Sequence, residues 1–128
     1  MNRDELEGVA SEVVHACLIV HRALGPGLLE SVYEACLEHE LRKLGLRVTR
    51  QHALPVRYDG LVLDTAFRVD LFVEQHLILE IKAVREVHPV HLAQLRTYLR
   101  CADCRLGLLL NFGGVLMKTG IHRVVNNL

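Results

Sequence analysis

The chain has 128 residues, which is the size of one ordinary domain, and 51% of them are hydrophobic. It has no low-complexity stretch, so we expect one compact domain over residues 1–128. Its core should consist mostly of Leu, Val, Ile and Ala, because aromatic residues are few. Its 15 basic and 15 acidic residues cancel, so the overall charge does not favour a nucleic-acid-binding protein, and no apolar run is long enough to span a membrane.

The first part of the chain has the spacing of two helices. Over residues 4–23 apolar side chains recur every three or four positions, which predicts a helix. The tripeptide Gly25-Pro26-Gly27 ends it, because glycine and proline interrupt helical structure. A second apolar stripe predicts a helix over residues 28–44, with Gly45 as its C-terminal cap.

The rest of the chain consists mainly of predicted strands, expected over residues 48–58, 61–73, 77–84, 105–111 and 117–125. Pro55 cannot donate to a sheet ladder, which indicates an edge strand or a bulge. Asp59-Gly60 is typical of a tight turn, and His88-Pro89 marks a turn before a helix over residues 90–101. The order of two helices, three strands, one helix and two strands predicts an α/β or α+β fold.

The chain has four cysteines, at positions 17, 36, 101 and 104. The N-terminus is acidic and polar, unlike a secretory signal peptide, so we expect a cytoplasmic protein with free thiols. Cys17 and Cys36 fall among apolar helix positions and are predicted core residues. Cys101 and Cys104 form a lone CxxC pair without the second pair that a structural zinc site requires, so a zinc-stabilised domain is the weakest alternative.

The most informative residues lie in the hairpin between the second and third predicted strands. If residues 74–76 form its loop, Asp70 lies directly opposite Glu80, and Lys82 lies opposite Arg68. Two facing carboxylates repel each other, and a divalent cation such as Mg²⁺ or Mn²⁺ between them would remove that conflict. The neighbouring ammonium could then hold a water molecule or a phosphate. This pattern indicates a metal-dependent phosphodiesterase site; the alternative is an exposed sheet face with ordinary ion pairs.

Three motifs resemble those of a known superfamily. Asp70 followed by Glu80-Ile81-Lys82 resembles the PD-(D/E)XK nuclease signature, with Val69 at the position of the motif's proline. The segment Gly27–Tyr33 matches the GxxExxY motif that names a small bacterial family of that superfamily, and Gln94–Tyr98 resembles the QxxxY helix of RecB-type members. The resemblance implies a restriction-endonuclease-like fold, in which helices flank a mixed central sheet and two helices form the N-terminus.

The resemblance also implies roles for single residues. Asp70 and Glu80 would ligate one Mg²⁺ or Mn²⁺, with the backbone carbonyl of Ile81 as a third ligand. Glu30 resembles the helix carboxylate that completes the metal shell, directly or through water, although the helix dipole alone also favours an acidic residue there. Lys82 would orient or help deprotonate the attacking water, or stabilise charge on the phosphate.

Three further residues are candidates for supporting roles. Gln94 and Tyr98 lie one turn apart on one helix face, where they could contact the substrate backbone or brace Lys82 and Glu80. The alternative is a helix face that points to solvent. Tyr33 is expected to support the site by packing or hydrogen bonding.

Two functions follow from these residues. The first is a nuclease that hydrolyses DNA or RNA, without sequence specificity, because no base-reading element is visible. The second is a non-enzymatic module that keeps the nuclease fold and binds a protein partner or nucleic acid. A nuclease would need a local basic rim, for which the candidates are Arg47, Arg50, Arg57, Arg68, Arg96 and Arg100. The apolar segment 121–128 could form the edge of a homodimer.

Overall fold

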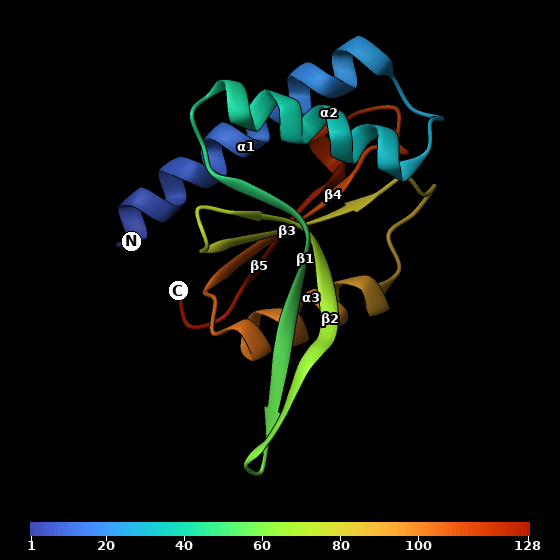
Figure 1. Cartoon of the computed structure of the whole chain (residues 1–128). Coiled ribbons are helices and arrows are strands. Elements are labelled where there is room, and N and C mark those ends of the chain that lie inside the picture. The colour runs from blue at the N-terminus through green and yellow to red at the C-terminus, as the bar shows by residue number, and fades with distance from the viewer.

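The computed structural model describes all residues, 1–128, and consists of a five-stranded sheet between helices (Figure 1). The helices are α1 (Arg3–Leu24), α2 (Glu30–Lys43) and α3 (Pro89–Ala102), with a short 3₁₀ helix, η1 (Lys118–Gly120). The strands are β1 (Val48–Tyr58), β2 (Leu61–Val73), β3 (Leu77–Lys82), β4 (Leu106–Asn111) and β5 (Ile121–Val125). The predicted order of elements and the predicted α+β class are confirmed.

The sheet has the strand order β1-β2-β3-β4-β5 and is mixed. Its neighbouring strands run antiparallel except for β3 and β4, which are parallel. Parallel neighbours need a crossover connection, and α3 supplies it. The predicted mixed central sheet is therefore confirmed, with β1 and β5 at its two edges.

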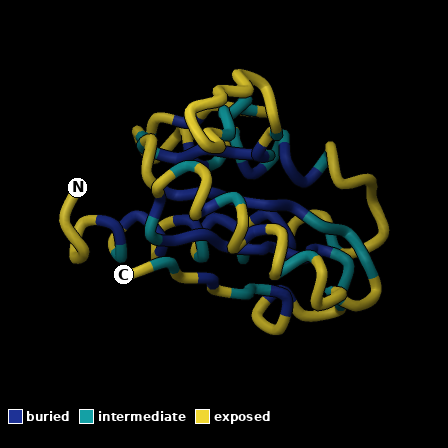
Figure 2. Tube along the Cα trace, turned by 90° about the horizontal axis from the view of Figure 1, so that it is seen from below, coloured by how far each residue is buried: buried dark blue, intermediate teal, exposed yellow.

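The helices cover opposite faces of the sheet (Figure 1). The larger apolar cluster joins α1 and α2 to one face, and the smaller cluster joins α3 to the other. Because β3 and β4 are covered on both faces, almost all of their residues are buried (Figure 2). This explains why these two strands are nearly continuous apolar runs rather than alternating ones.

The connection between α1 and α2 is organised by Tyr33. Its hydroxyl donates to the Gly25 carbonyl at 2.5 Å and accepts from the Leu28 backbone N–H at 3.1 Å. Gly25 itself has a left-handed backbone, with φ of 69°. Since Leu29 is extended and caps the helix, α2 begins at Glu30, two residues later than the sequence predicted.

The hairpin of β1 and β2 extends beyond the rest of the sheet as a two-stranded ribbon (Figure 1). Its register shifts between Leu54 and Val56, which confirms the irregularity expected at Pro55. Asp59 and Gly60 form its turn, both with positive φ. The bounds of both strands agree with the prediction.

Two strands are shorter than predicted by two residues or more. β3 ends at Lys82 rather than at Val84, because the Asn111 side chain occupies both backbone polar groups of Val84. The last strand begins at Ile121 rather than at Met117, because η1 precedes it. A tertiary contact therefore limits β3, whereas a local helical turn delays the start of β5.

The cysteines are all free. Cys17 is fully buried, which confirms its predicted place in the core, and burial raises the pKa of its thiol. Cys36 is only half-buried. Of the CxxC pair, Cys104 is buried and Cys101 is exposed. No helix is both long enough and apolar enough to span a membrane.

Candidate active site

The site begins where β2 separates from β3. The ladder between them pairs Val73 with Leu77 and ends at Leu71 and Leu79, so the predicted three-residue loop and register are confirmed. Asp70 and Glu80 follow directly, and their side chains replace the ladder: the Asp70 N–H donates to Glu80 Oε2 at 3.3 Å. The Ile81 N–H donates to Asp70 Oδ2 at 2.7 Å. The two carboxylates, hereafter the carboxylate pair, therefore lie against each other as predicted.

The register does not extend to Lys82. Its expected neighbour, Arg68, pairs instead with Ala53 of β1, because β2 has already left β3 at this point. Neither Arg68 nor Lys82 is among the residues that form ion pairs, so the alternative of an ordinary salt-bridged sheet face is wrong. Lys82 lies two residues beyond Glu80 and thus on the same side of the strand. Across β4 its register partner is Asn111.

Glu80 has an unusual environment for a carboxylate. It is 8% exposed, and its pKa is raised to about 9 by burial first, and then by the hydrogen bond and the negative charge of Asp70. Lys82 acts in the opposite direction but more weakly. At neutral pH, and without a cation, Glu80 is therefore protonated and shares its proton with Asp70.

A second set of polar residues approaches Asp70 from α2 and β1. Gln51 Nε2 donates to Asp70 Oδ1 at 3.2 Å and to Glu34 Oε1 at 2.8 Å. Glu34 is buried and is paired with Arg50 at 2.6 Å. No sequence motif predicted a role for Gln51 or Glu34. The available signal was a charged residue within the apolar stripe of α2, between Tyr33 and Leu37.

The comparison with protein families agrees with this geometry. The family model described as the PD-(D/E)XK nuclease superfamily matches residues 7–124. The chain belongs to the PD-(D/E)XK nuclease superfamily. This confirms the predicted superfamily and its fold, while membership of the narrower GxxExxY family stays a prediction. Neither the curated proteins nor the solved structures gave a match.

In this PD-(D/E)XK protein, Glu30 is not part of the carboxylate pair. It is exposed at the first position of α2, and no three His, Cys, Asp or Glu side chains lie close enough together to share a metal ion. Of the two metal-binding roles expected for Glu30, direct or through water, only the one through water is compatible with this geometry. The nearer carboxylate of α2 is Glu34, one turn further along the helix.

Residues of α3 approach the pair from the opposite side. Tyr98 stacks on Phe67 with ring centroids 4.4 Å apart, and its pKa is raised by burial and by the charges of Glu80 and Asp70. Gln94, one turn earlier, is exposed. At the start of α3, burial and then the charge of Lys82 lower the pKa of His91. The α3 face that carries these three residues thus borders the site.

Tyr33 lies deeper in the protein. It is fully buried and stacks on Phe112 with centroids 4.7 Å apart, in addition to its two hydrogen bonds to the loop before α2. These contacts position α2, and with it Glu34, rather than any group that could reach a substrate.

The arginines of the expected basic rim divide into two groups. Arg47 and Arg50 pair with Glu74 and Glu34, so their charges are balanced within the chain. The others are exposed: Arg57 on the ribbon, Arg68 near Gln51, whose carbonyl it contacts at 3.3 Å, and Arg96 and Arg100 on α3. The arginines of the expected rim that remain available to a polyanion therefore lie on β2, α3 and the ribbon.

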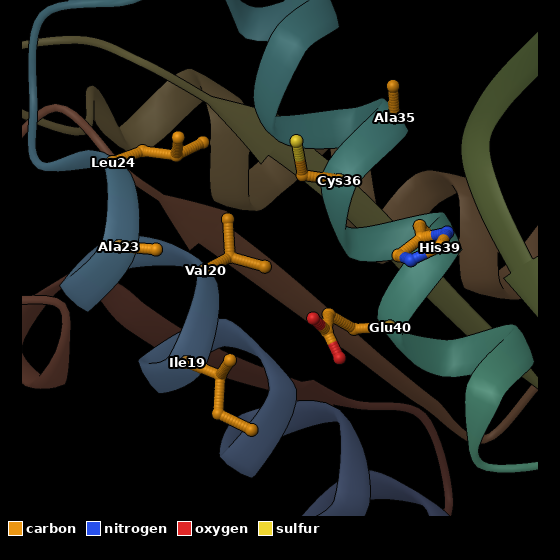
Figure 3. A pocket seen from close by; sticks show the side chains of 8 residues that line it. All are labelled: Ile19, Val20, Ala23, Leu24, Ala35, Cys36, His39 and Glu40. Atoms are coloured by element: carbon orange, nitrogen blue, oxygen red, sulfur yellow. The ribbon is translucent and has the colours of Figure 1, made fainter.

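Two hollows differ in character. A polar cavity of about 350 Å³ lies beyond the end of β3 and is lined by Arg85, Asn111 and His122, among others. An apolar groove of about 270 Å³ lies between α1 and α2, where Figure 3 shows Cys36 and His39 facing Val20 and Leu24. Only the polar cavity adjoins the β3 end that carries Lys82, through Asn111.

Proposed function

We propose that this protein is a divalent-metal-dependent nuclease that hydrolyses phosphodiester bonds of DNA or RNA. The observation that carries the proposal is the carboxylate pair, in which Glu80 is buried and Asp70 is half-buried, with Lys82 two residues further on the same side of β3. A buried acid with a raised pKa beside a second carboxylate is characteristic of functional sites.

The donor set fits Mg²⁺ or Mn²⁺. Mg²⁺ keeps several waters and binds through one or two carboxylates, so a site with two protein carboxylates is sufficient. Asp70 and Glu80 would hold the ion, with the Ile81 carbonyl as a third ligand and Glu30 acting through water. When bound, the ion supplies a polarised phosphodiester and an activated water. A bound cation would replace the proton that the raised pKa of Glu80 keeps on this carboxyl at neutral pH.

The remaining residues would bind and orient the substrate. Lys82 carries a positive charge beside the carboxylate pair, where it can hold the attacking water or a phosphate oxygen. Gln94 and Tyr98 offer an amide and a hydroxyl on the α3 face, within reach of a backbone that enters from that side. None of these groups reads base edges, so we propose cleavage without sequence specificity.

We further propose that residues 1–128 act as one nuclease-like domain of the GxxExxY family. β5 lies at an open edge of the sheet, with Val125 exposed, and we propose it as a homodimer contact. Multi-angle light scattering of the parent and of Val125→Lys would test this contact, since a lysine at an edge blocks strand pairing. A monomeric parent would refute the proposed homodimer.

The first experiment is a calorimetric titration of Mn²⁺ or Mg²⁺ into the parent and Asp70→Ala. Each protein is also incubated with single- and double-stranded DNA and RNA. Metal binding and cleavage by the parent alone would establish the nuclease and its substrate class. Binding without cleavage would support the alternative, a nuclease-fold module that binds a partner or nucleic acid. No binding by either protein would refute the metal site.

A further inference from the structure

We propose that Gln51 is a positioning residue for the metal ligand Asp70, and that Glu34 and Arg50 act through it. The proposal rests on the function proposed above and extends the site to residues outside the superfamily signature. The supporting relay consists of Arg50, Glu34 and Gln51. Its members come from β1 and α2, whereas the carboxylate pair comes from β2 and β3.

The backbone of Gln51 is the first observation. Its φ of 50° is left-handed, which is unfavourable for a residue with a side chain. It lies within β1 between two regular pairs, Arg50 with Leu71 and His52 with Val69, and thus at the level of Asp70. Residues in such conformations often occur at functional sites, where surrounding contacts hold them. Here the Arg68 side chain donates to the Gln51 carbonyl.

The hydrogen bonds of the Gln51 amide are the second observation. Its nitrogen has two hydrogens, and the two acceptors are Glu34 Oε1 at 2.8 Å and Asp70 Oδ1 at 3.2 Å. Because both neighbours are carboxylates, only the amide nitrogen can face them. Gln51 therefore separates two negative groups and donates to each, without itself adding charge.

Glu34 is itself held in place. Its side chain is 8% exposed and accepts from Arg50 Nε at 2.6 Å, and Arg50 also approaches Glu38 at 3.8 Å. A buried carboxylate with a charged partner and an amide donor has few alternative positions. Because Glu34 is fixed on α2, its hydrogen bond restrains the side chain of Gln51.

The consequence for Asp70 is that each of its oxygens has one donor besides the protonated Glu80. Oδ1 accepts from Gln51 and Oδ2 accepts from the Ile81 N–H at 2.7 Å. An ionised carboxylate has about four lone-pair positions, so those left over point away from both donors and are available to a cation. Loss of such an outer partner typically weakens metal affinity about 10- to 100-fold.

The test is a calorimetric Mn²⁺ titration, without substrate, of the parent, Gln51→Ala and Gln75→Ala. Gln75 is a matched control because it also has a left-handed backbone, with φ of 57°, but lies exposed in the β2–β3 turn. We expect Gln51→Ala to bind Mn²⁺ about 10- to 100-fold more weakly, and Gln75→Ala to bind as the parent does. Equal affinity of Gln51→Ala and the parent would overturn the proposal.

A double-mutant cycle separates a relay from general destabilisation. If Glu34 acts through Gln51, Glu34→Ala weakens Mn²⁺ binding in the parent but adds nothing to Gln51→Ala. Additive losses would overturn the relay. If Gln51→Ala does not fold, Gln51→Asn replaces it, because Asn tolerates a left-handed backbone and its shorter side chain cannot span both carboxylates.

The failure of this proposal differs from the failure of the proposed function. A parent that binds no Mn²⁺ would overturn both proposals. Equal Mn²⁺ affinities of the parent and Gln51→Ala would overturn the relay alone. In cleavage assays, a positioning role predicts that Gln51→Ala raises the half-saturating Mn²⁺ concentration more than it lowers the rate at saturating metal. The opposite pattern would overturn it.

Discussion

The two sides of the carboxylate pair differ in how firmly they are held. On the α2 side, the Gln51 amide donates to both Asp70 and Glu34, and Glu34 is anchored by Arg50. On the α3 side, Tyr98 is held by stacking on Phe67, and Gln94 is exposed. The difference indicates that the α2 side sets the geometry of the ligands, while the α3 side is the one that a substrate can approach.

The largest effect is expected from removal of a member of the carboxylate pair. Asp70→Ala or Glu80→Ala should abolish Mn²⁺ binding and reduce cleavage by a factor on the order of 1,000 or more, since the site has only two carboxylates. Asp64→Ala is the matched control, because Asp64 is exposed on the same strand. Variants that bind Mn²⁺ like the parent would show that the metal site is wrong.

Loss of the ammonium should separate binding of the metal from the chemistry. Lys82→Ala should keep Mn²⁺ affinity and lower the cleavage rate by about 100- to 1,000-fold, because it removes a positive charge that stabilises the phosphate or orients the water. Single-turnover cleavage at saturating metal measures this, with exposed Lys118→Ala as the control. Undiminished cleavage would remove the role proposed for Lys82.

The raised pKa of Glu80 predicts a specific pH dependence of stability. Between about pH 5 and pH 9 the folded protein keeps a proton on Glu80 that the unfolded chain releases. The free energy of unfolding should therefore fall as pH rises across this window, by at most about 1.4 kcal/mol per pH unit. Glu80→Gln, which stays neutral and can still donate to Asp70, should remove this decline.

Urea unfolding in EDTA at several pH values measures this difference. At pH 8 we expect Glu80→Gln to be more stable than the parent by about 2 kcal/mol, although it cannot bind metal. Glu86→Gln, at an exposed position, is the control and should follow the parent. A parent with the same pH profile as Glu80→Gln would contradict the protonated state of Glu80.

The smallest effect is expected on the open side of the site. Gln94→Ala should raise the KM for the nucleic acid about 3- to 10-fold with little change in kcat, as expected for loss of one hydrogen bond to a substrate backbone. Thr97→Ala, an exposed substitution elsewhere on α3, is the control. An unchanged KM would leave this helix face as ordinary solvent-exposed surface.

Much of the fold could be predicted because it depends on local patterns. Alternating and continuous apolar runs gave the bounds of β1 and β2, and the three-residue turn set the register that brings Asp70 to Glu80. The register of Lys82 could not be predicted in this way. It depends on where β2 leaves β3, beyond which β2 stays paired with β1 alone.

The sequence by itself determined the carboxylate pair, because strand periodicity and a short turn place nearby residues together regardless of the rest of the chain. Only the tertiary structure decided which glutamate of α2 is linked to Asp70 through Gln51. Glu30 and Glu34 lie one turn apart on α2, but the packing of that helix against β1 buries Glu34 beside Gln51 and leaves Glu30 in solvent. Such a choice depends on the contact between two distant segments, and local sequence patterns carry no information about it.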